Sequence, residues 1–348
     1  MFRQKTIILV SMIILIVISG YIIYYLKYQF PQKIVIKQEK EEVFRNVCLS
    51  DNEVAEYSIY PSKRKYIKDP LFISVKDRNT DQEKYNFQIE NVSLSYHALE
   101  IHKCGVFVIR VFNFDDEKGI PLPDYRTELW QYQYDGSGRK IIDLFKKEGA
   151  PDNYGQDFRI DFSETYIALE RSYLSNPNYA LVIKDLKTKD DVYVLSLNEI
   201  VKKYPEIEGS IGFNEWNKNG RYFWFNIFSG ANILAFFRLE RDAWQVNIFP
   251  APKDVLGGDA LNLENGYITV HPGNIWFGIA EIYEQEKEKR RQQGIGTQLY
   301  IHNLFTGDRK FVASTTEPLH YFKPKWLSDT ELEYELPTGE KKIYKIEE

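Results

Sequence analysis

The chain has 348 residues and a formal net charge of −5, from 45 basic and 50 acidic side chains. This mildly acidic balance argues against nucleic acid or an anionic membrane surface as the main partner, because both attract proteins with basic patches. Aromatic residues make up 15% of the sequence, with 25 Tyr and 22 Phe. That content favours strands over helices.

The first predicted element is a membrane-spanning helix at residues 7–26, IILVSMIILIVISGYIIYYL, a segment without a charged residue. Twenty residues rising about 1.5 Å each span about 30 Å, the thickness of the hydrocarbon core of a bilayer. Arg3 and Lys5 precede the segment and tyrosines gather near its end. We therefore expect residues 1–6 in the cytoplasm and the rest outside. No later window of about 18 residues lacks a charge, which predicts a single-pass protein of the cell membrane.

A cleaved signal peptide is the alternative for this segment, with cleavage after Gly20. The apolar run continues past that position, whereas the apolar region of a signal peptide ends before its cleavage site. We therefore expect an uncleaved anchor, a linker at residues 27–41 and an extracytoplasmic domain at residues 42–348.

Alternating strands recur along residues 42–348. Residues 157–197 contain four of them, DFRIDFS, YIALERS, YALVIKDL and DDVYVLSL, joined by a tight turn, a longer loop and another tight turn. The same order of strands and loops recurs in five other units, although the last unit has only three strands. We place the first strands of the six units near Val43, Ser95, Phe158, Ile211, Tyr267 and His320.

These units predict an all-β fold, a β-propeller of about six four-stranded blades. The segment KIVIK at residues 33–37 looks like a strand, and we expect it to pair with residues 341–346 and close the ring. A β-sandwich, or two smaller β domains, is the alternative. The repeated short–long–short order of the loops favours the propeller.

Several turns carry a motif that supports this interpretation. The segments FSETYIALE, WNKNGRYFWF, HPGNIWFGI and WLSDTELEYEL resemble the strand–turn–strand core of TolB-like and WD40-like propeller repeats, and KDLKTKD and HNLFTGD resemble their next turn. The resemblance covers residues 42–346 and is degenerate, since no unit has the full SPDGK motif. It implies a propeller fold, and TolB-like propellers are mostly protein-binding modules.

The loop lengths are asymmetric. In an up-and-down blade the first and third turns lie at one end, and here they are short. The long segments fall at the other end: 61–70, 113–126, 146–156, 172–178, 198–209, 250–266 and 281–296. Long loops on one side of a rigid fold often form a binding surface, so we predict that partners bind there. Ordinary solvated loops are the alternative.

Two of these loops contain residues suited to protein contacts, because Tyr and Arg combine contact area with hydrogen bonding. The candidate ligand- or partner-binding residues are Asp115, Asp116, Asp124, Tyr125 and Arg126 in one loop and Tyr173, Asn176, Asn178 and Tyr179 in the next. The charged run at residues 281–293 could form a short helix with Glu–Lys and Glu–Arg pairs four residues apart, or a merely solvated segment.

Motifs for chemistry are absent from the sequence: there is no P-loop, GxGxxG, GxSxG, HExxH or CxxC. The five His residues are spread over the repeats, so we predict no metal site, no cofactor and no catalytic residue. Under the propeller model, Cys48 and Cys104 lie at the same end of adjacent blades. A disulfide between them is therefore feasible in an oxidising compartment.

Taken as a sequence, the chain is best interpreted as a membrane-anchored extracytoplasmic β-propeller that binds a protein or a cell-envelope polymer. The long-loop end and the missing catalytic motifs favour this function. One alternative is a membrane-anchored enzyme acting on glycans, with carboxylates converging in the central channel. A third possibility is a purely structural envelope component.

Overall fold

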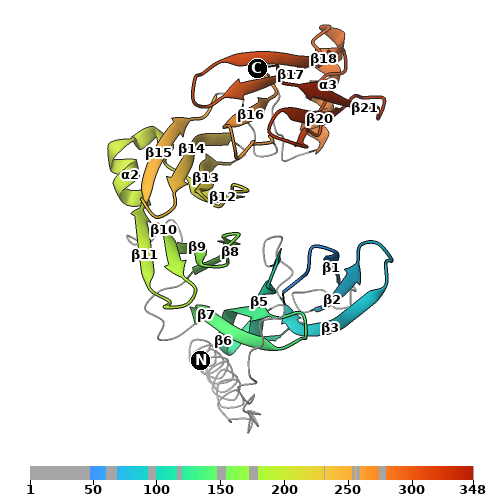
Figure 1. Cartoon of the computed structure of the whole chain (residues 1–348). Helices are drawn as coiled ribbons and strands as arrows, with labels where there is room; N and C mark the ends of the chain where they lie inside the picture. Colours follow the sequence, from blue (N-terminus) through green and yellow to red (C-terminus); the bar gives the residue numbers. More distant parts are fainter. Residues whose placement is uncertain are drawn as a thin grey trace, which may run out of the picture. The chain divides into compact units, whose positions relative to one another are not determined.

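The computed structural model describes residues 48–59, 69–92, 99–115, 120–146, 154–171, 179–230, 232–252, 255, 259–273 and 280–347. The predicted membrane helix at 7–26 and the predicted closing strand at 33–37 lie outside these residues. None of the helices in the described part is long and apolar enough to cross a bilayer. In this part the fold is all-β, as predicted, with short helices between strands (Figure 1).

The first two predicted units form one continuous antiparallel sheet. Val92 pairs with Arg110, and this single pair joins the strands of the first unit to those of the second. The strand order is β1–β2–β3–β5–β6–β7, with β4 beside β5. The bounds are β1 (Glu53–Ile59), β2 (Asp69–Asp77), β3 (Glu83–Val92), β4 (Leu99–His102), β5 (Gly105–Asp115), β6 (Ile120–Tyr132) and β7 (Gly138–Lys146).

The next two units are separate four-stranded antiparallel sheets, as predicted from residues 157–197 and 210–249. Their strands are β8 (Tyr154–Ile160), β9 (Tyr166–Arg171), β10 (Ala180–Asp185) and β11 (Asp191–Ser196), then β12 (Ser210–Trp216), β13 (Tyr222–Ser229), β14 (Asn232–Glu240) and β15 (Gln245–Pro250). The segment between the sheets, expected to be a loop, contains α2 (Leu197–Lys203) and η1 (Pro205–Ile207). Leu197, Ile200 and Ile207 are buried there, so these helices belong to the core.

The fifth unit differs from the prediction. Its strands are β16 (Tyr267–Val270), β17 (Thr297–Asn303) and β18 (Arg309–Thr315). The sequence placed the first strand of this unit near Tyr267, with HPGNIWFGI as its strand–turn–strand core, whereas Tyr267 pairs with Asn303, and Ala280 begins the helix α3 (Ala280–Gln292).

Two local features explain this difference. The segment LNLENG forms the tight turn, with Gly266 at φ +69° and an antiparallel bridge from Leu261 to Ile268. Tyr267 therefore starts the second strand of its unit. The EIYEQEKEKRRQ run consists mainly of strong helix formers, and Glu286 pairs with Arg290 one turn later at 3.0 Å. Of the two alternatives given for residues 281–293, a short helix and a merely solvated segment, the structure shows the helix.

The last unit has three described strands, as predicted: β19 (Lys325–Trp326), β20 (Glu331–Glu335) and β21 (Lys341–Lys345). Its first strand is shorter than expected and begins at Lys325 rather than near His320. The segment from His320 to β19 still belongs to this unit, because the Glu335 N–H donates to the Phe322 carbonyl at 2.7 Å.

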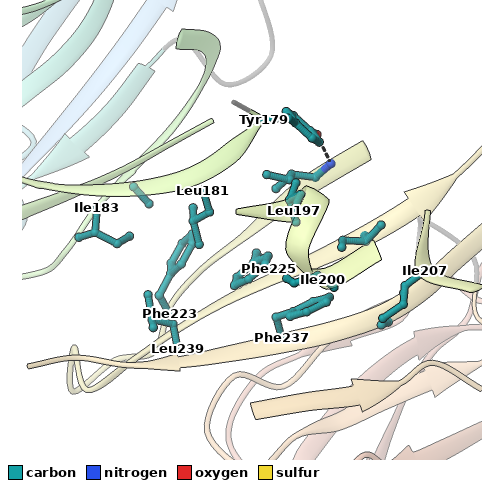
Figure 2. Packing of buried hydrophobic residues seen from close by; sticks show 14 of the residues in the cluster. Tyr179, Leu181, Ile183, Leu197, Ile200, Ile207, Phe223, Phe225, Phe237 and Leu239 are labelled. Carbon is teal, nitrogen blue, oxygen red and sulfur yellow. Dashed lines mark hydrogen bonds between the residues drawn. The ribbon is translucent and has the colours of Figure 1, made fainter. Parts of the chain in front are cut away.

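Apolar cores join each sheet to the next one in the chain. In β10, Leu181 and Ile183 face the β12–β15 sheet, while Ala180 and Val182 face the β5–β7 strands. Both faces of β10 are therefore buried, which explains its nearly continuous apolar sequence. Figure 2 shows the first of these cores, where Leu181 and Ile183 lie beside Phe223, Phe225, Phe237 and the α2 residues Leu197 and Ile200.

A buried polar residue begins a tight turn in each of the three middle sheets, and we call these the latch residues: Asp161 after β8, Asn217 after β12 and Asn262 after the bridging residue Leu261. The side-chain oxygen of each one accepts a backbone N–H within its own turn. Each one also contacts the following sheet. Arg241 donates to Asp161 at 2.8 Å, and Asn217 donates to Glu264 at 2.9 Å. Asn262 donates to the carbonyls of residues 328 and 329. The latch residues thus tie neighbouring sheets together.

The outer faces of the first and last units are polar, in contrast to the faces between sheets. In the last sheet, Lys341 pairs with Glu333 at 2.9 Å and Lys345 with Glu331 at 2.8 Å, on the face opposite the core. In the first unit, Lys76 pairs with Glu56 at 2.8 Å on the corresponding face. Both end faces therefore satisfy their own charges across neighbouring strands.

Candidate functional site

The predicted binding loop at 113–126 is mostly a hairpin. β5 continues to Asp115 and β6 begins at Ile120, with Phe114 opposite Pro121 and Asp115 opposite Ile120. Asn113 has φ +55°, and its side chain donates to the Asp124 carbonyl at 2.9 Å, which fixes a bulge between the strands. We call this extension, residues 112–126, the β5–β6 arm. Its tip, 116–119, lies outside the described residues.

A ladder of stacked cations and rings lies at the base of this arm. The Arg126 guanidinium lies 4.5 Å from the centre of the Phe112 ring, and the Arg110 guanidinium lies 4.9 Å from the same ring. Arg110 also lies 4.6 Å from the Trp130 ring. Residues two apart on a strand share a face, and Phe112 pairs with Arg126 across the two strands. Strand geometry therefore builds the ladder.

Glu128 fixes the two sides of the ladder. It is 4% exposed, and it accepts from the Arg126 Nε and the Trp130 Nε1, both at 2.8 Å. Arg110 is held separately, since its Nε donates to the Glu90 carbonyl at 3.2 Å. These bonds hold the guanidinium planes of Arg110 and Arg126 in place against the rings.

The structure places several predicted contact residues together on the arm. Asp124 is exposed and Arg126 is about one-third exposed, with 36% of its side-chain surface accessible. The Tyr125 ring lies 5.9 Å from the ring of Phe114 and 5.6 Å from that of Phe145. Asp115 ends β5 on the same arm. The arm therefore combines a fixed aromatic base with an exposed polar rim.

The remaining predicted contact residues do not join this surface. Asp116, Tyr173, Asn176 and Asn178 lie outside the described residues. Tyr179 is 2% exposed, and its hydroxyl accepts from the Ile211 N–H at 2.8 Å. Burial, together with the nearby Glu170 carboxylate, raises the pKa of Tyr179. Tyr179 therefore holds two sheets together in the interior, and we leave it out of the proposed surface.

A second site lies where the first strands β4, β8 and β12 end, on the side of the short turns. It is a cavity of about 160 Å³. Its lining residues are Glu100, Ile101, His102, Arg159, Ile160, Phe162, Glu215 and Trp216. The sequence prediction missed this cavity. The sequence contains a signal for it, namely a charged residue near the end of an apolar strand. Arg159 lies two positions before Asp161, and Glu215 lies two positions before Asn217.

Hydrogen bonds fix most of the charged groups around this cavity. Arg159 donates to Asp157 at 2.7 Å and to the Asn214 carbonyl at 2.8 Å. The Glu100 Oε2 accepts from the Ile160 N–H at 2.8 Å and lies 2.9 Å from the His102 Nε2. The Glu100 Oε1 is buried without a hydrogen-bond donor among the described residues.

Cys48 and Cys104 form a disulfide in the structure. Cys104 lies in the turn between β4 and β5, close to the cavity. The Cys104 N–H donates to Glu164 at 2.7 Å, and the Leu49 N–H donates to the Lys103 carbonyl at 2.7 Å. Burial raises the pKa of Glu164. The disulfide therefore attaches the segment before β1 to a turn that is itself fixed to the next sheet.

Within the described ranges, no group of three or more His, Cys, Asp or Glu side chains could hold a metal ion. His102 contacts Glu100, and its ring meets Phe107 edge to face at 5.4 Å. The geometry of both sites thus consists of fixed side chains that can bind a molecule by stacking and hydrogen bonding.

No family model matches the sequence, and no curated protein matches it. The solved structures to which this chain is similar include proteins described as β-propellers. The β-propeller domain of the Trilobed protease from Pyrococcus furiosus has 9% identity and a TM-score of 0.44, over 86% of this chain and 79% of that one. An oligogalacturonate lyase in complex with manganese has 9% identity and a TM-score of 0.41, over 84% and 96%. A TolB-type protein from Agrobacterium tumefaciens has 7% identity and a TM-score of 0.34, over 71% and 77%.

Proposed function

We propose that the chain is a membrane-anchored, extracytoplasmic β-propeller that binds a protein or a cell-envelope polymer through the β5–β6 arm. The observation that carries the binding role is the ladder of Arg110, Phe112, Arg126 and Trp130, held by Glu128. Arg and aromatic side chains supply most of the binding energy in many interfaces. A rigid set of them beside the exposed Asp124 suits this role.

The propeller architecture is supported by the order of the sheets. Each antiparallel sheet packs on the next one in the chain through an apolar core. Each of the three middle sheets also has a latch residue at the start of a tight turn. We keep residues 33–37 as the proposed closing strand beside β21, since three strands are described in the last sheet.

The extracytoplasmic location is supported by the Cys48–Cys104 disulfide, because such bonds persist in oxidising compartments and are rare in the cytosol. The uncharged segment at residues 7–26 has the length of a membrane span. Together they suit a domain held outside the membrane by an N-terminal helix. Labelling from outside intact cells tests this location, and a domain reached only after lysis would contradict it.

The binding role is tested by affinity capture of the full chain from cross-linked membranes. We expect the triple variant Asp124→Ala, Tyr125→Ala and Arg126→Ala to recover a specific partner at least tenfold less than the wild type, because it removes the rim and one rung of the ladder. The matched control is Lys187→Ala with Thr188→Ala, in the short β10–β11 turn at the opposite end of the strands. Equal recovery by the triple variant and the wild type would exclude the arm as the binding surface.

A glycan-active enzyme is the second candidate, favoured by the carboxylates of Glu100 and Glu215 on one cavity. Glycosidases use a pair of carboxylates that flank the scissile bond. Against this, the cavity is smaller than most small-molecule sites, and the Ile160 N–H and His102 already engage one Glu100 oxygen. Release of reducing ends from envelope glycans, abolished by Glu215→Gln, would favour the enzyme over the binding module.

A further inference from the structure

The cavity at the ends of β4, β8 and β12 contains hydrogen-bond acceptors that have no donor among the described residues. The Glu100 Oε1 has no hydrogen-bond donor among the described residues, and Arg159 approaches it only to 3.7 Å. Glu215 is exposed and makes no hydrogen bond or ion pair to any residue that the structure describes. Two carboxylates from strands of different sheets therefore face one small space.

The cationic groups of the wall are already engaged. The Arg159 guanidinium donates to Asp157, to the Asn214 carbonyl and to the Phe158 carbonyl. The positive charge of Arg159 is therefore offset mainly by the Asp157 carboxylate, which lies 2.7 Å from the Arg159 Nη1, and less by the more distant Glu100. His102 lies against the other Glu100 oxygen. An anion would meet two carboxylates in this cavity, whereas a cation would meet open acceptors.

Aromatic side chains complete the wall. Trp216 is 3% exposed, and its Nε1 points to the Arg159 carbonyl at 3.5 Å. Phe162, in the turn after β8, is 55% exposed although it lines the cavity. Organic cations are attracted to aromatic faces, and the attraction grows when the cation leaves water. Carboxylates and aromatic rings together are the surroundings that a cationic head group prefers.

We propose that this cavity binds a guanidinium or alkylammonium head group. The head group would donate charge-assisted hydrogen bonds to the carboxylates of Glu100 and Glu215. It would lie against the side chains of Phe162 and Trp216. The volume of about 160 Å³ suits a head group with a short stem, since sites for whole small molecules measure about 300–1,000 Å³. This site is independent of the β5–β6 arm, which continues beyond the opposite ends of the strands.

Two sources can supply such a head group, namely an Arg or Lys side chain of a partner and a free amine. Saturation-transfer NMR on the full chain in detergent micelles tests both, with Nα-acetylarginine amide and agmatine as probes. Nα-acetylcitrulline amide is the control because it has nearly the shape of the arginine probe without its charge. We expect saturation transfer to the methylenes beside the guanidinium in both cationic probes and none in the citrulline probe.

Substitutions of Glu100 and Glu215 test whether the cationic probes bind in this cavity. We expect the double variant Glu100→Gln and Glu215→Gln to bind the cationic probes at least about tenfold more weakly, because both charges are removed from a partly desolvated site. Glu208→Gln, at an exposed carboxyl without a contact to the described residues, should bind like the wild type. Should the double variant fail to fold, Glu215→Gln alone carries the test, because Glu215 is exposed and supports no hydrogen bond.

Each outcome decides the proposal. Tighter binding of acetylarginine amide than of agmatine would indicate a partner side chain, and the reverse order would indicate a free amine. Equal binding of the citrulline probe, unchanged binding by the variants, or no saturation transfer to either cationic probe would overturn the proposal. The result is separable from partner capture by the arm, because the arm variants leave Glu100 and Glu215 intact.

Discussion

Asp161 is the charged member of the three latch residues, and it has no exposed surface. Its carboxylate accepts from the Thr165 and Tyr166 N–H groups, both at 2.7 Å, and from Arg241 of the next sheet. Removing one partner of a buried ion pair leaves the other charge uncompensated. Asp161 therefore makes the joint between two sheets sensitive to a single side chain.

We predict that Arg241→Ala lowers the free energy of unfolding by about 3 kcal/mol, because Asp161 would stay buried without its cation. The matched control is Arg221→Ala on the same sheet. Arg221 is 63% exposed and pairs with Glu240 at the surface, so its loss should change stability by about 0–1 kcal/mol. Urea unfolding measures both variants, and equal effects would contradict the role given to Asp161.

Glu53 should confer a pH dependence on stability. Hydrogen bonds from Lys84, and next from the Ser50 N–H, lower the pKa of Glu53 from 4.5 to about 2. A lowered pKa means that the folded state favours the charged carboxylate. The stabilisation is therefore complete above pH 4.5 and disappears as the pH falls toward 2.

We predict that the stability difference between the wild type and Glu53→Gln is constant near neutral pH. It should shrink below pH 4.5 and vanish near pH 2. Thermal unfolding over this pH range measures the difference, with Glu208→Gln as the control for loss of one exposed carboxyl. A difference that persists unchanged to pH 2 would show that the carboxylate charge of Glu53 is not what stabilises β1.

At the residue scale, the sequence predicted which candidate contact residues lie together on one segment, but not that Tyr179 is buried. Asp124, Tyr125 and Arg126 fall on one arm because they are adjacent in sequence and their position on a hairpin follows from that. Tyr179 directly precedes β10, and the alternation of apolar residues does not reveal that its hydroxyl lies against β12 of the next sheet. The pairing of Glu100 with the Ile160 N–H likewise depends on packing between sheets, which no local pattern contains.

At the scale of elements, the Cys48–Cys104 disulfide joins two segments that are 56 residues apart. We predict that the variant Cys48→Ser with Cys104→Ser loses about 4 kcal/mol of unfolding free energy, according to the chain-entropy model for a loop of this length. Chemical denaturation under oxidising and reducing conditions measures this loss. The reduced wild type should match the double variant, and an unchanged midpoint after reduction would contradict the prediction.

Most strands could be predicted because alternation and tight turns are local properties. The strands β9, β10 and β11 follow from the sequence to within one residue at each end, whereas β8 begins and ends three residues before the predicted segment DFRIDFS. The fifth unit was shifted because LNLENG was not recognised as a turn, so Tyr267 was counted as the first strand instead of the second. The helices α2 and α3 lie where loops were expected, since long connections leave room for structure that repeats do not encode.

At the scale of the whole domain, the end faces distinguish the first and last units from the middle ones. Burying paired charges costs several kcal/mol per ion before their attraction is counted. Glu331, Glu333, Lys341 and Lys345 therefore favour a hydrated outer face on the last sheet.

We predict that Lys341 and Lys345 react with an amine-acylating reagent as fast as Lys218, a 74% exposed lysine. The reason is that they are 63% and 73% exposed and, among the residues that the structure describes, they pair only across their own sheet. Mass spectrometry of timed digests measures the three rates in the folded full chain. Strong protection of Lys341 and Lys345 relative to Lys218 would indicate that another surface covers the last sheet.

The latch residues all contact the sheet that follows them in the chain, which gives the domain a direction. Asp161 accepts from Arg241. Asn217 donates to Glu264, and Asn262 donates to the carbonyls of residues 328 and 329, so every partner comes later in the sequence. During synthesis, each sheet therefore completes the hydrogen bonds of the one made before it. A chain that stops before the last sheet leaves the amide of Asn262 without these acceptors, so premature termination should yield a product that proteases recognise at its unfinished end.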